Sequence, residues 1–253
     1  MPNRTTISAI LFASFTLLPA APALAQGEII ITQAKANAGN VTPGDAAGFP
    51  VTLTLPGAYV LGSNLNPPAA KIGIQVTSHN VDIDMNGFRL NGSNVAYHGV
   101  ASGYGESRIH DGIITSFKFD GIVLAGVGTN SWVVENMQIV NNGRDGISAN
   151  DGYYSRFLNN SVLQNDRYGI ICGYFCHADG NNVSDNGLHG IALRSGTVLG
   201  NTIFSNFFYG ILDSAGSSDT GFGNNTIVDN NAGGIQVSGV LSLHPNRCLP
   251  TAC

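Results

Sequence analysis

A two-residue step, glycine followed by a branched apolar residue, recurs along most of the chain. From Ile74 to Ile235 there are 161 residues in seven intervals, or 23 residues per repeat, and the single intervals run from 20 to 26. A period of this length is typical of a solenoid, in which each repeat is one structural unit stacked on the next. The steps are Gly73-Ile74, Gly99-Val100, Gly121-Ile122, Gly146-Ile147, Gly169-Ile170, Gly190-Ile191, Gly210-Ile211 and Gly234-Ile235.

A pattern of paired asparagines lies in register with the glycine step. A looser copy runs from Asn136 through Asn141 to Gly146 and has one inserted residue. Regular copies of Asn-x-(Val/Ile)-x-x-Asn-x-x-x-Gly-Ile cover residues 160–170, 181–191, 201–211 and 225–235. Recurrence of both asparagines at fixed positions indicates that they occupy equivalent sites in successive repeats.

These patterns predict short strands joined by tight turns. Apolar residues at alternate positions point to one side of a strand, and Gly and Asn reach the left-handed backbone conformations that tight turns require. One coil cannot bury its own apolar face, so coils stack and share a core. We therefore predict an all-β fold, a single-stranded right-handed parallel β-helix of about eight coils over residues 71–240. Stacking would align the asparagines into a hydrogen-bonded ladder.

Three other repeat folds fit less well. A leucine-rich repeat needs a regular leucine framework that this chain lacks. A helical solenoid needs apolar spacing of three to four residues, whereas Val81–Met85 alternates apolar and acidic residues. A propeller blade repeats every 40 residues or more, roughly twice the period found here.

The first 25 residues read as an export signal. Arg4 is the only charged residue before Glu28, an apolar run covers 7–18, and Ala23-Leu24-Ala25 resembles a cleavage site. The apolar run is shorter than the ~20 residues of a membrane span, which disfavours the alternative of a retained anchor. We predict a signal peptide over 1–25, cleavage near Ala25 and a secreted or periplasmic protein without a membrane span.

The segments beside the repeats are predicted to cap the solenoid, because open strand edges pair with other chains unless covered. Residues 26–70 lack the repeat and are assigned to an N-terminal cap, with a strand at 29–31, a short helix near 33–38 and a hairpin-like pair of strands turning at Pro56-Gly57. Residues 241–253 are assigned to a C-terminal cap with a disulfide.

The net charge of the chain argues against some classes of binding partner. The net charge is −5, or −6 once Arg4 is removed (−5 − 1), and no Lys/Arg block exists, which disfavours nucleic acid and anionic membranes as partners.

The four cysteines form two close pairs, Cys172/Cys176 and Cys248/Cys253. Disulfides are the default in an exported protein, and local pairing is favoured among the three connectivities because each bond would staple one turn. Zinc is the alternative, disfavoured by the distance between the pairs.

Three stretches carry a family resemblance: "VTPGDAAGFPVTLTLPGAYVLGSNL", "VTSHNVDIDMNGFRLNG" and "GIICGYFCHADGNNVSDNGLHGI". They resemble secreted bacterial right-handed parallel β-helix repeat proteins, which share the pectate-lyase-like fold, and the likeness covers nearly the whole mature chain. The resemblance implies the fold, export and the two local disulfides. It implies no reaction, because this group is largely uncharacterised and the local motifs of pectate lyases and polygalacturonases are not intact here.

The residues before each glycine step are the candidate site. If the coils are in register, these residues line one edge of the column, where aromatic rings can stack on sugars and arginines can hold an acidic sugar. The alternative is structural, since Asp before Gly is a common turn choice. The catalytic candidates are Asp120, Asp145 and His189. The ligand-binding candidates are His98, Tyr168, Tyr209, Arg144 and Arg167, and the column also includes Tyr97, Phe119, Leu188 and Phe208.

Other polar groups give weaker signals. Asp82 and Asp84 alternate with apolar residues, so both face outward and either bind Ca²⁺ or form a solvated strand face. No metal site or other cofactor is expected. His110-Asp111 and the pair His177 and Asp179 are assigned to turns, without an identified partner.

The sequence therefore favours an exported β-helix that binds an extended polysaccharide or cell-surface glycan along one face, without a catalytic motif. A polysaccharide-processing lyase, hydrolase or epimerase is the first alternative. A structural or adhesive exoprotein is the second.

Overall fold

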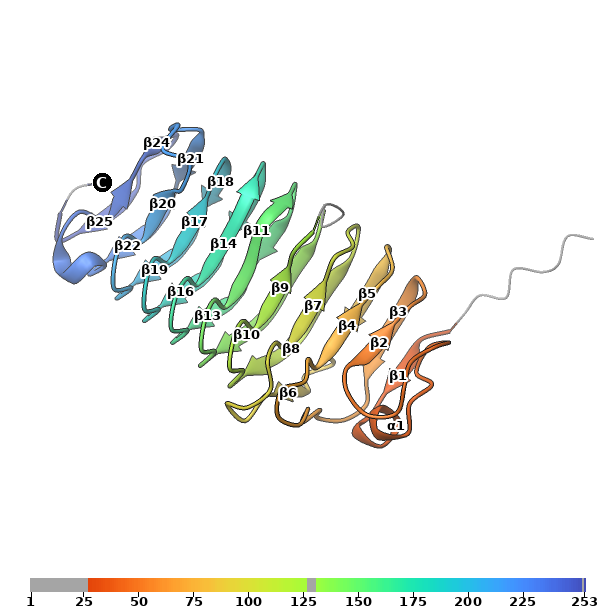
Figure 1. Ribbon diagram of the computed structural model, residues 1–253. Coiled ribbons are helices and arrows are strands. Elements are labelled where there is room, and N and C mark those ends of the chain that lie inside the picture. Colours follow the sequence, from red (N-terminus) through yellow and green to blue (C-terminus); the bar gives the residue numbers. More distant parts are fainter. Residues whose placement is uncertain (1–26, 127–130, 252) are drawn as a thin grey trace, which may run out of the picture.

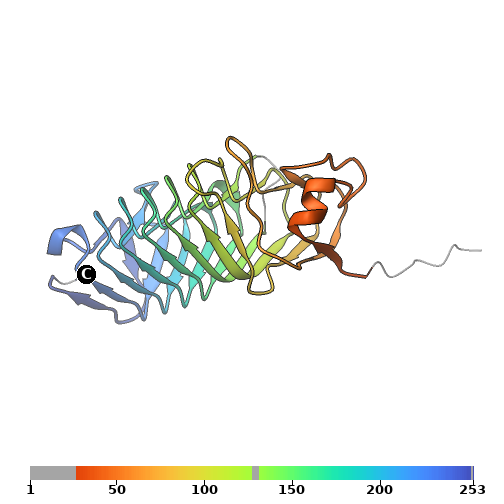
Figure 2. The same ribbon diagram turned by 90° about the horizontal axis from the view of Figure 1, so that it is seen from below.

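The computed structural model describes residues 27–126, 131–251 and 253, and these form a parallel β-solenoid (Figure 1). The coils stack along one axis, with the N-terminal coils at one end of the column and the C-terminal coils at the other (Figures 1 and 2). The predicted signal peptide over 1–25, with its cleavage point near Ala25, lies outside the described residues.

One wall of the solenoid is a sheet of nine strands within the described residues, here called sheet B. Every neighbouring pair is parallel and joins one coil to the next, so nine strands correspond to eight steps along the column. The strands are β2 (Val51–Leu53), β4 (Ile74–Val76), β7 (Val100–Ser102), β9 (Ile122–Leu124), β11 (Ile147–Tyr153), β14 (Ile170–Tyr174), β17 (Ile191–Leu193), β20 (Ile211–Asp213) and β23 (Val237–Ser238).

The other two walls belong to a 16-stranded sheet in the described chain, here called sheet A, which continues around one corner. Two long strands cross that corner, β8 (Arg108–Thr115) and β10 (Val133–Val140). The first wall has β1 (Ile29–Ile31), β3 (Gly57–Leu61), β5 (Val81–Asp84), β12 (Arg156–Leu158), β15 (Cys176–Asp179), β18 (Gly196–Leu199), β21 (Thr220–Gly223) and β24 (Val240–Ser242). The second has β6 (Arg89–Asn91), β13 (Ser161–Leu163), β16 (Asn182–Ser184), β19 (Thr202–Phe204), β22 (Thr226–Val228) and β25 (Arg247–Leu249).

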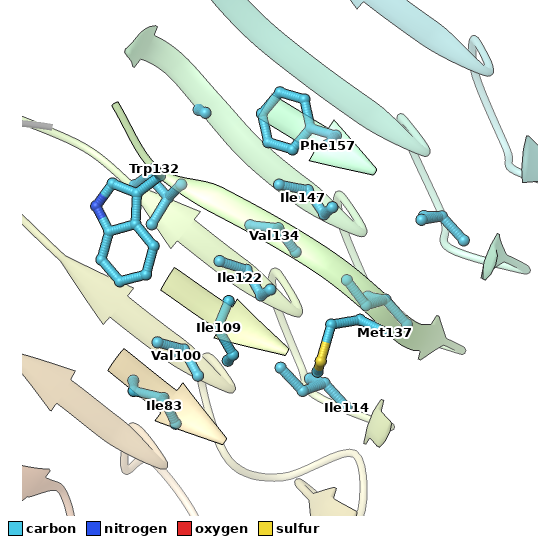
Figure 3. Packing of buried hydrophobic residues seen from close by; sticks show 14 of the residues in the cluster. Ile83, Val100, Ile109, Ile114, Ile122, Trp132, Val134, Met137, Ile147 and Phe157 are labelled. Carbon is cyan, nitrogen blue, oxygen red and sulfur yellow. The ribbon is translucent and has the colours of Figure 1, made fainter. Parts of the chain in front are cut away.

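The core consists of three rows of apolar side chains, one from each wall (Figure 3). From Gly73-Ile74 to Gly210-Ile211, the branched residue of each glycine step points inward from sheet B. It stacks on its equivalent in the neighbouring coil, as Ile122 on Ile147 and Ile147 on Ile170. Ile109, Val134 and Phe157 form part of the second row. The third row is Leu90, Ile114, Ile139, Val162, Val183, Ile203, Ile227 and Cys248.

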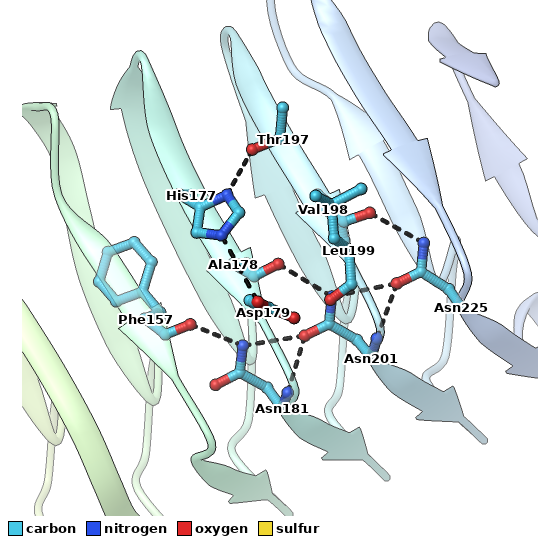
Figure 4. Close-up of polar contacts among 10 residues, drawn as sticks. All are labelled: Phe157, His177, Ala178, Asp179, Asn181, Thr197, Val198, Leu199, Asn201 and Asn225. Carbon is cyan, nitrogen blue, oxygen red and sulfur yellow. Dashed lines mark hydrogen bonds and ion pairs between the residues drawn. The ribbon is translucent and has the colours of Figure 1, made fainter. Parts of the chain in front are cut away.

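The predicted asparagine ladder exists, and there are two of them. In each ladder the amide oxygen of one asparagine accepts from the backbone N–H and from Nδ2 of the asparagine one coil earlier, as between Asn181 and Asn201 (Figure 4). Both ladders are buried, so they satisfy polar groups that the turns would otherwise leave unpaired. One runs through Asn160, Asn181, Asn201, Asn225 and Asn246, and the other through Asn142, Asn165, Asn186, Asn206, Asn230 and Gln236.

The N-terminal segment contains the predicted strand and helix but no hairpin. Helix α1 (Gln33–Ala38) starts after Thr32, whose Oγ1 accepts the Lys35 N–H at 3.1 Å, and it buries Ala36. The hairpin-like pairing was wrong: β2 pairs with β4 and β3 with β1 and β5, all in parallel. Pro56-Gly57 therefore forms a corner of the first coil, and the predicted cap over 26–70 contains strands that are already in solenoid register.

The last coil departs from the repeat. Val237, not Ile235, stacks on Ile211, and Ile235 is 62% exposed. A 3₁₀ turn at Asn231–Gly233 lengthens this coil, and Gln236 Oε1 replaces the next asparagine of the ladder. The predicted cap over 241–253 still pairs with the preceding coil through β24 and β25.

The cysteines pair locally, Cys172 with Cys176 and Cys248 with Cys253, with Cα–Cα distances of 6.4 and 5.4 Å. The first bond spans the turn between β14 and β15, and the second ties the C-terminal residue to β25. In the part of the chain described here, no helix is long and apolar enough to cross a membrane.

Candidate functional site

The predicted column lies along one border of sheet B, at the residues that immediately precede its strands. We call this border the leading edge; it comprises His98, Asp120, Asp145, Tyr168, His189 and Tyr209, with Tyr97, Phe119, Arg144, Arg167, Leu188 and Phe208 one residue earlier. The register of sheet B places these residues one above another on successive coils. The structure therefore brings the sequence-predicted site residues together.

The two carboxylates of the leading edge face the backbone. Asp120 is 1% exposed and accepts the Asp145 N–H at 3.0 Å, and Asp145 is 3% exposed and accepts the Tyr168 N–H at 3.2 Å. Arg144 and Arg167 lie beside them, each with Nε 3.7 Å from a carboxylate oxygen. These contacts connect consecutive coils, which is the structural role open to an Asp before Gly. The predicted acid/base role of these residues stays a prediction.

Burial shifts the pKa values of two titratable groups of the leading edge in opposite directions. Burial raises the pKa of Asp145, and the nearby Asp120 carboxylate raises it further. Burial lowers the pKa of His189, whose Nδ1 also accepts the Tyr209 N–H at 3.1 Å. His98 Nδ1 lies 3.2 Å from Asp120 Oδ2.

Asp145→Asn should gain stability relative to the wild type as the pH rises from about 3.5 to 7, by about 1 kcal/mol. The raised pKa means that wild-type stability is greatest while the carboxyl is protonated and falls as the pH passes through the folded-state pKa. The amide keeps an acceptor for the Tyr168 N–H without the buried charge. Urea unfolding across this pH range measures the difference, with exposed Asp166→Asn as the control. A difference that stays constant or shrinks with rising pH would contradict it.

Aromatic rings stack along the leading edge. Tyr168 and His189 have ring centroids 5.5 Å apart, and His189 and Tyr209 5.4 Å apart, in near-parallel arrangements. Phe208 joins this group at 5.4 Å from His189, and Tyr97 and Phe119 form a similar pair two coils before Tyr168. The predicted ligand-binding tyrosines thus belong to a continuous set of rings on the surface.

The opposite border of sheet B, here called the trailing edge, carries a second set of rings that sequence reasoning missed. Tyr153 and Tyr174 stack at 5.5 Å, and beside them Tyr154 and Phe175 stack at 5.3 Å. Tyr154 and Phe175 are 58% and 57% exposed and both have left-handed backbone, with φ of 58° and 57°. A bulky residue in this conformation is strained, and the strain holds two large rings in solvent where Asn or Gly would fit with less strain.

A cleft of about 350 Å³ opens at the trailing edge, lined by Gly126, Asp151, Tyr153, Tyr174 and Arg194. The Arg194 guanidinium lies over the Tyr174 ring, 5.7 Å from its centroid. The signal for this site was present in the sequence as two aromatic pairs at positions 153–154 and 174–175, one repeat apart.

A third polar cluster lies on the first wall of sheet A. Strand register places Asp82 beside Arg108 and Asp84 beside His110. His110 is buried, with Nε2 3.2 Å from Asp82 Oδ1 and Nδ1 2.7 Å from Asp111 Oδ2. Asp82 and Asp84 face outward as predicted. The assignment to turns was wrong, because His110 and Asp111 lie in β8 and His177 and Asp179 lie in β15. His110 and Asp111 also have partners that the sequence did not reveal. Asp82 and Asp84 lie in the irregular first interval, Gly73 to Gly99. The repeat pattern is absent there, so the strand register that pairs them with Arg108 and His110 could not be predicted from the sequence.

The third cluster also bears on metal binding. Ligand atoms of Asp84, His110 and Asp111 lie within 4.8 Å of one another. One imidazole among two carboxylates suits a transition metal better than Ca²⁺, which takes six to eight oxygen ligands. The hydrogen bond from His110 lowers the pKa of Asp111. Further along the same wall, His177 contacts Thr197 and lies 3.7 Å from Asp179 (Figure 4).

The fold and its site define a β-solenoid with polar and aromatic edges, and comparison with known proteins gives its family. The family model described as "Right handed beta helix region" matches residues 71–232, so the chain belongs to this family. This confirms the predicted right-handed parallel β-helix. No curated protein sequence matches the chain.

Solved structures agree with this fold. Two crystal structures of variants of the periplasmic alginate epimerase AlgG match with TM-scores of 0.53 and 0.55, each at 16% identity, over 76% and 75% of this chain and 49% and 50% of theirs. The Dettilon tailspike protein matches with a TM-score of 0.45 and 13% identity, over 78% of this chain and 51% of its own. This chain thus spans about half the length of these structures. The likeness to the two AlgG structures shows the shared fold alone.

Proposed function

We propose that this protein binds an extended glycan across sheet B, between the leading and trailing edges. The observation that carries the proposal is the stacking of rings on successive coils at both edges, Tyr168–His189–Tyr209 at one and Tyr153–Tyr174 at the other. Rings that stack on each other form a rigid apolar border whose edges lie next to polar groups, which suits the mixed surface of a sugar.

The surface between the two edges supports this proposal. The outward side chains of sheet B are small or aliphatic, as at Ala101, Val123, Ser148, Ile171 and Ala192, and only some of them are buried. A chain of sugars lying there would meet rings at both ends of β14 and at one end of β11, β17 and β20, with no bulky charged group in between. Arg144, Arg167 and His98, predicted to bind ligand, belong to the leading edge of this surface.

Export supports a glycan ligand. Both disulfides are typical of a compartment outside the cytoplasm, and a secreted or periplasmic protein meets cell-surface and released polysaccharides. The AlgG neighbour is itself periplasmic, and its name gives alginate as its substrate. Alginate is therefore one member of the test panel.

Processing of a polysaccharide is the second candidate function, and the third cluster favours it. His110 is held between carboxylates on an exposed wall, an arrangement in which an imidazole can move a proton. Lyase, hydrolase and epimerase chemistry are all open to such a group. The leading-edge candidates Asp120, Asp145 and His189 remain part of this alternative.

The test is a polysaccharide panel, scored for binding and for product. We expect at least one polymer to bind without new reducing ends, unsaturated product or change of sugar configuration. Tyr174→Ala and Tyr209→Ala, one at each edge, should each weaken that binding at least about fivefold, since buried aromatic contacts dominate binding energy. Ile30→Ala, which removes an exposed apolar side chain on β1, is the control and should leave binding unchanged.

The outcomes separate the candidate functions. Product formation on any polymer would replace binding by catalysis as the function. Absence of both binding and product across the panel would reject the proposal in favour of a structural or adhesive role. Binding that resists both tyrosine substitutions would place the glycan elsewhere on the column.

A further inference from the structure

The arginines of this protein differ in their partners. Four of those described are half-buried, and three of these, Arg108, Arg144 and Arg167, lie beside carboxylates of neighbouring coils. Arg194 is the exception among the described residues, because its guanidinium has no carboxylate partner and no side-chain hydrogen bond, and only the Tyr174 ring lies against it. A half-buried guanidinium without a counter-ion in the protein is free to pair with an anionic ligand.

The surroundings of Arg194 form a small site. The guanidinium opens into the trailing-edge cleft together with the rings of Tyr153 and Tyr174 and the exposed carboxylate of Asp151. Tyr153, Tyr174 and Arg194 come from three consecutive coils and place flat groups one after another. The cleft therefore offers the edges of two tyrosine rings, one cation and one hydrogen-bond acceptor.

We propose that this cleft binds a carboxylate-bearing sugar unit, a uronate, of the glycan; this inference rests on the proposed glycan-binding function. Arg194 pairs with the sugar carboxylate, because a planar guanidinium matches a carboxylate in a two-point hydrogen-bonded contact. The edges of the two tyrosine rings line the pyranose, because Tyr174 stacks on Tyr153 and Arg194 lies over its ring. Asp151 accepts hydroxyl protons of the sugar. A phosphate or other doubly charged group fits less well, because Asp151 repels it more strongly than a single negative charge.

The test is titration calorimetry on the whole protein with matched glycans. The probes are oligomers of galacturonate, of mannuronate and of hyaluronate, each compared with its carboxyl-reduced, neutral counterpart. We expect at least one acidic oligomer to bind and its neutral counterpart to bind at least about tenfold more weakly, as the loss of a charged hydrogen-bonded pair implies. Rising salt should weaken binding of the acidic form only.

Substitutions in the cleft test whether it causes the preference for acidic over neutral oligomers. Arg194→Gln should lower affinity for the acidic oligomer about tenfold and leave affinity for a neutral one unchanged, and Arg194→Lys should fall between because it keeps charge without the planar contact. Arg89→Gln, at an exposed arginine of β6, makes the same charge change elsewhere and is the control. Thermal melting verifies folding, and Tyr174→Phe keeps the ring as a second check that the pocket is intact.

Each result decides between the two proposals. Equal affinity for acidic and neutral forms, binding of neutral glycans only, or an Arg194→Gln variant that discriminates like the wild type would overturn the uronate site and leave glycan binding in place. Failure of every oligomer and of the polysaccharide panel would overturn both.

Discussion

Asn201→Ala is expected to lower the free energy of unfolding by about 3–5 kcal/mol, a large part of the stability of an ordinary domain. The Asn201 side chain is buried in the middle of the first ladder. Its Nδ2 donates to Asn225 Oδ1 at 3.0 Å, to the Ala178 carbonyl at 3.0 Å and to the Leu199 carbonyl at 2.8 Å. Its Oδ1 accepts from the Asn181 N–H at 2.8 Å and from Asn181 Nδ2 at 2.9 Å.

The size of this effect comes from the groups left behind. Truncation removes the acceptor of two Asn181 donors and the amide donor to the Ala178 carbonyl, whereas the Leu199 carbonyl keeps the Gly180 N–H. Each buried group left without a partner costs about 1–3 kcal/mol. Partial entry of water into the turn would offset some of this cost, which keeps the expected total below the simple sum.

Denaturant unfolding measures the effect, and a neighbouring asparagine gives the control. Asn182 follows the ladder residue Asn181 directly, but its side chain is exposed on β16 and makes no hydrogen bond within the described structure. Asn182→Ala should change the free energy of unfolding by less than about 0.5 kcal/mol. Equal effects of the two substitutions would show that the ladder contributes no more than an exposed amide.

The repeat was predictable because the same local chemistry recurs. Each asparagine position is a turn that needs its backbone groups satisfied, and each is satisfied by the equivalent residue of the next coil. Copies of one pattern therefore fix both the strands and their register, as the stacking of Ile147 on Ile170 confirms. Export, the cap boundaries and the roles of the site residues stay predictions.

The pattern failed where coils are irregular. Pro56-Gly57 is compatible with either a hairpin or a solenoid corner, and only pairing of β2 with β4 across the coil distinguishes them. At the other end, Gly234-Ile235 matches the repeat in letters, yet the preceding 3₁₀ turn moves Val237 into the core instead. Local sequence does not reveal how many residues a turn absorbs.

The sequence predicted where the leading edge lies, but not how its side chains are buried and bonded. The residues before each glycine do form one edge, but burial of Asp120 and Asp145 against backbone N–H groups could not be read from the sequence. The trailing-edge cleft was missed because its aromatic pairs occur in only two coils, at the ends of β11 and β14, and lie outside the glycine and asparagine pattern. The partner of His110 was missed because Asp82 and Asp84 lie outside the regular repeat.

Gly169→Ala is expected to cost about 2–4 kcal/mol, although alanine is otherwise the smallest change available. A Cβ at this position would lie 2.5 Å from Val183 Cγ1, 2.7 Å from the Gly190 carbonyl oxygen and 2.9 Å from Asn186 Nδ2. Two of these atoms belong to the next coil's backbone and buried ladder, so they cannot move aside without breaking stacking or hydrogen bonds.

The same geometry explains why the whole pattern recurs as a unit. The branched residue, the second asparagine and the glycine of neighbouring coils touch one another, so a larger residue at any of these positions would clash. The glycines at 121, 146 and 190 meet equivalent neighbours, and Gly210 meets the branched residue and the asparagine of the next coil. Gly103→Ala is the control, because its nearest neighbour would be the Ala125 carbonyl oxygen at an ordinary 3.5 Å. Adding Val183→Ala to Gly169→Ala should restore only part of the lost free energy of unfolding, since the Gly190 carbonyl still clashes. Full recovery in the double variant, measured by urea unfolding, would instead assign the glycine requirement to the valine methyl alone.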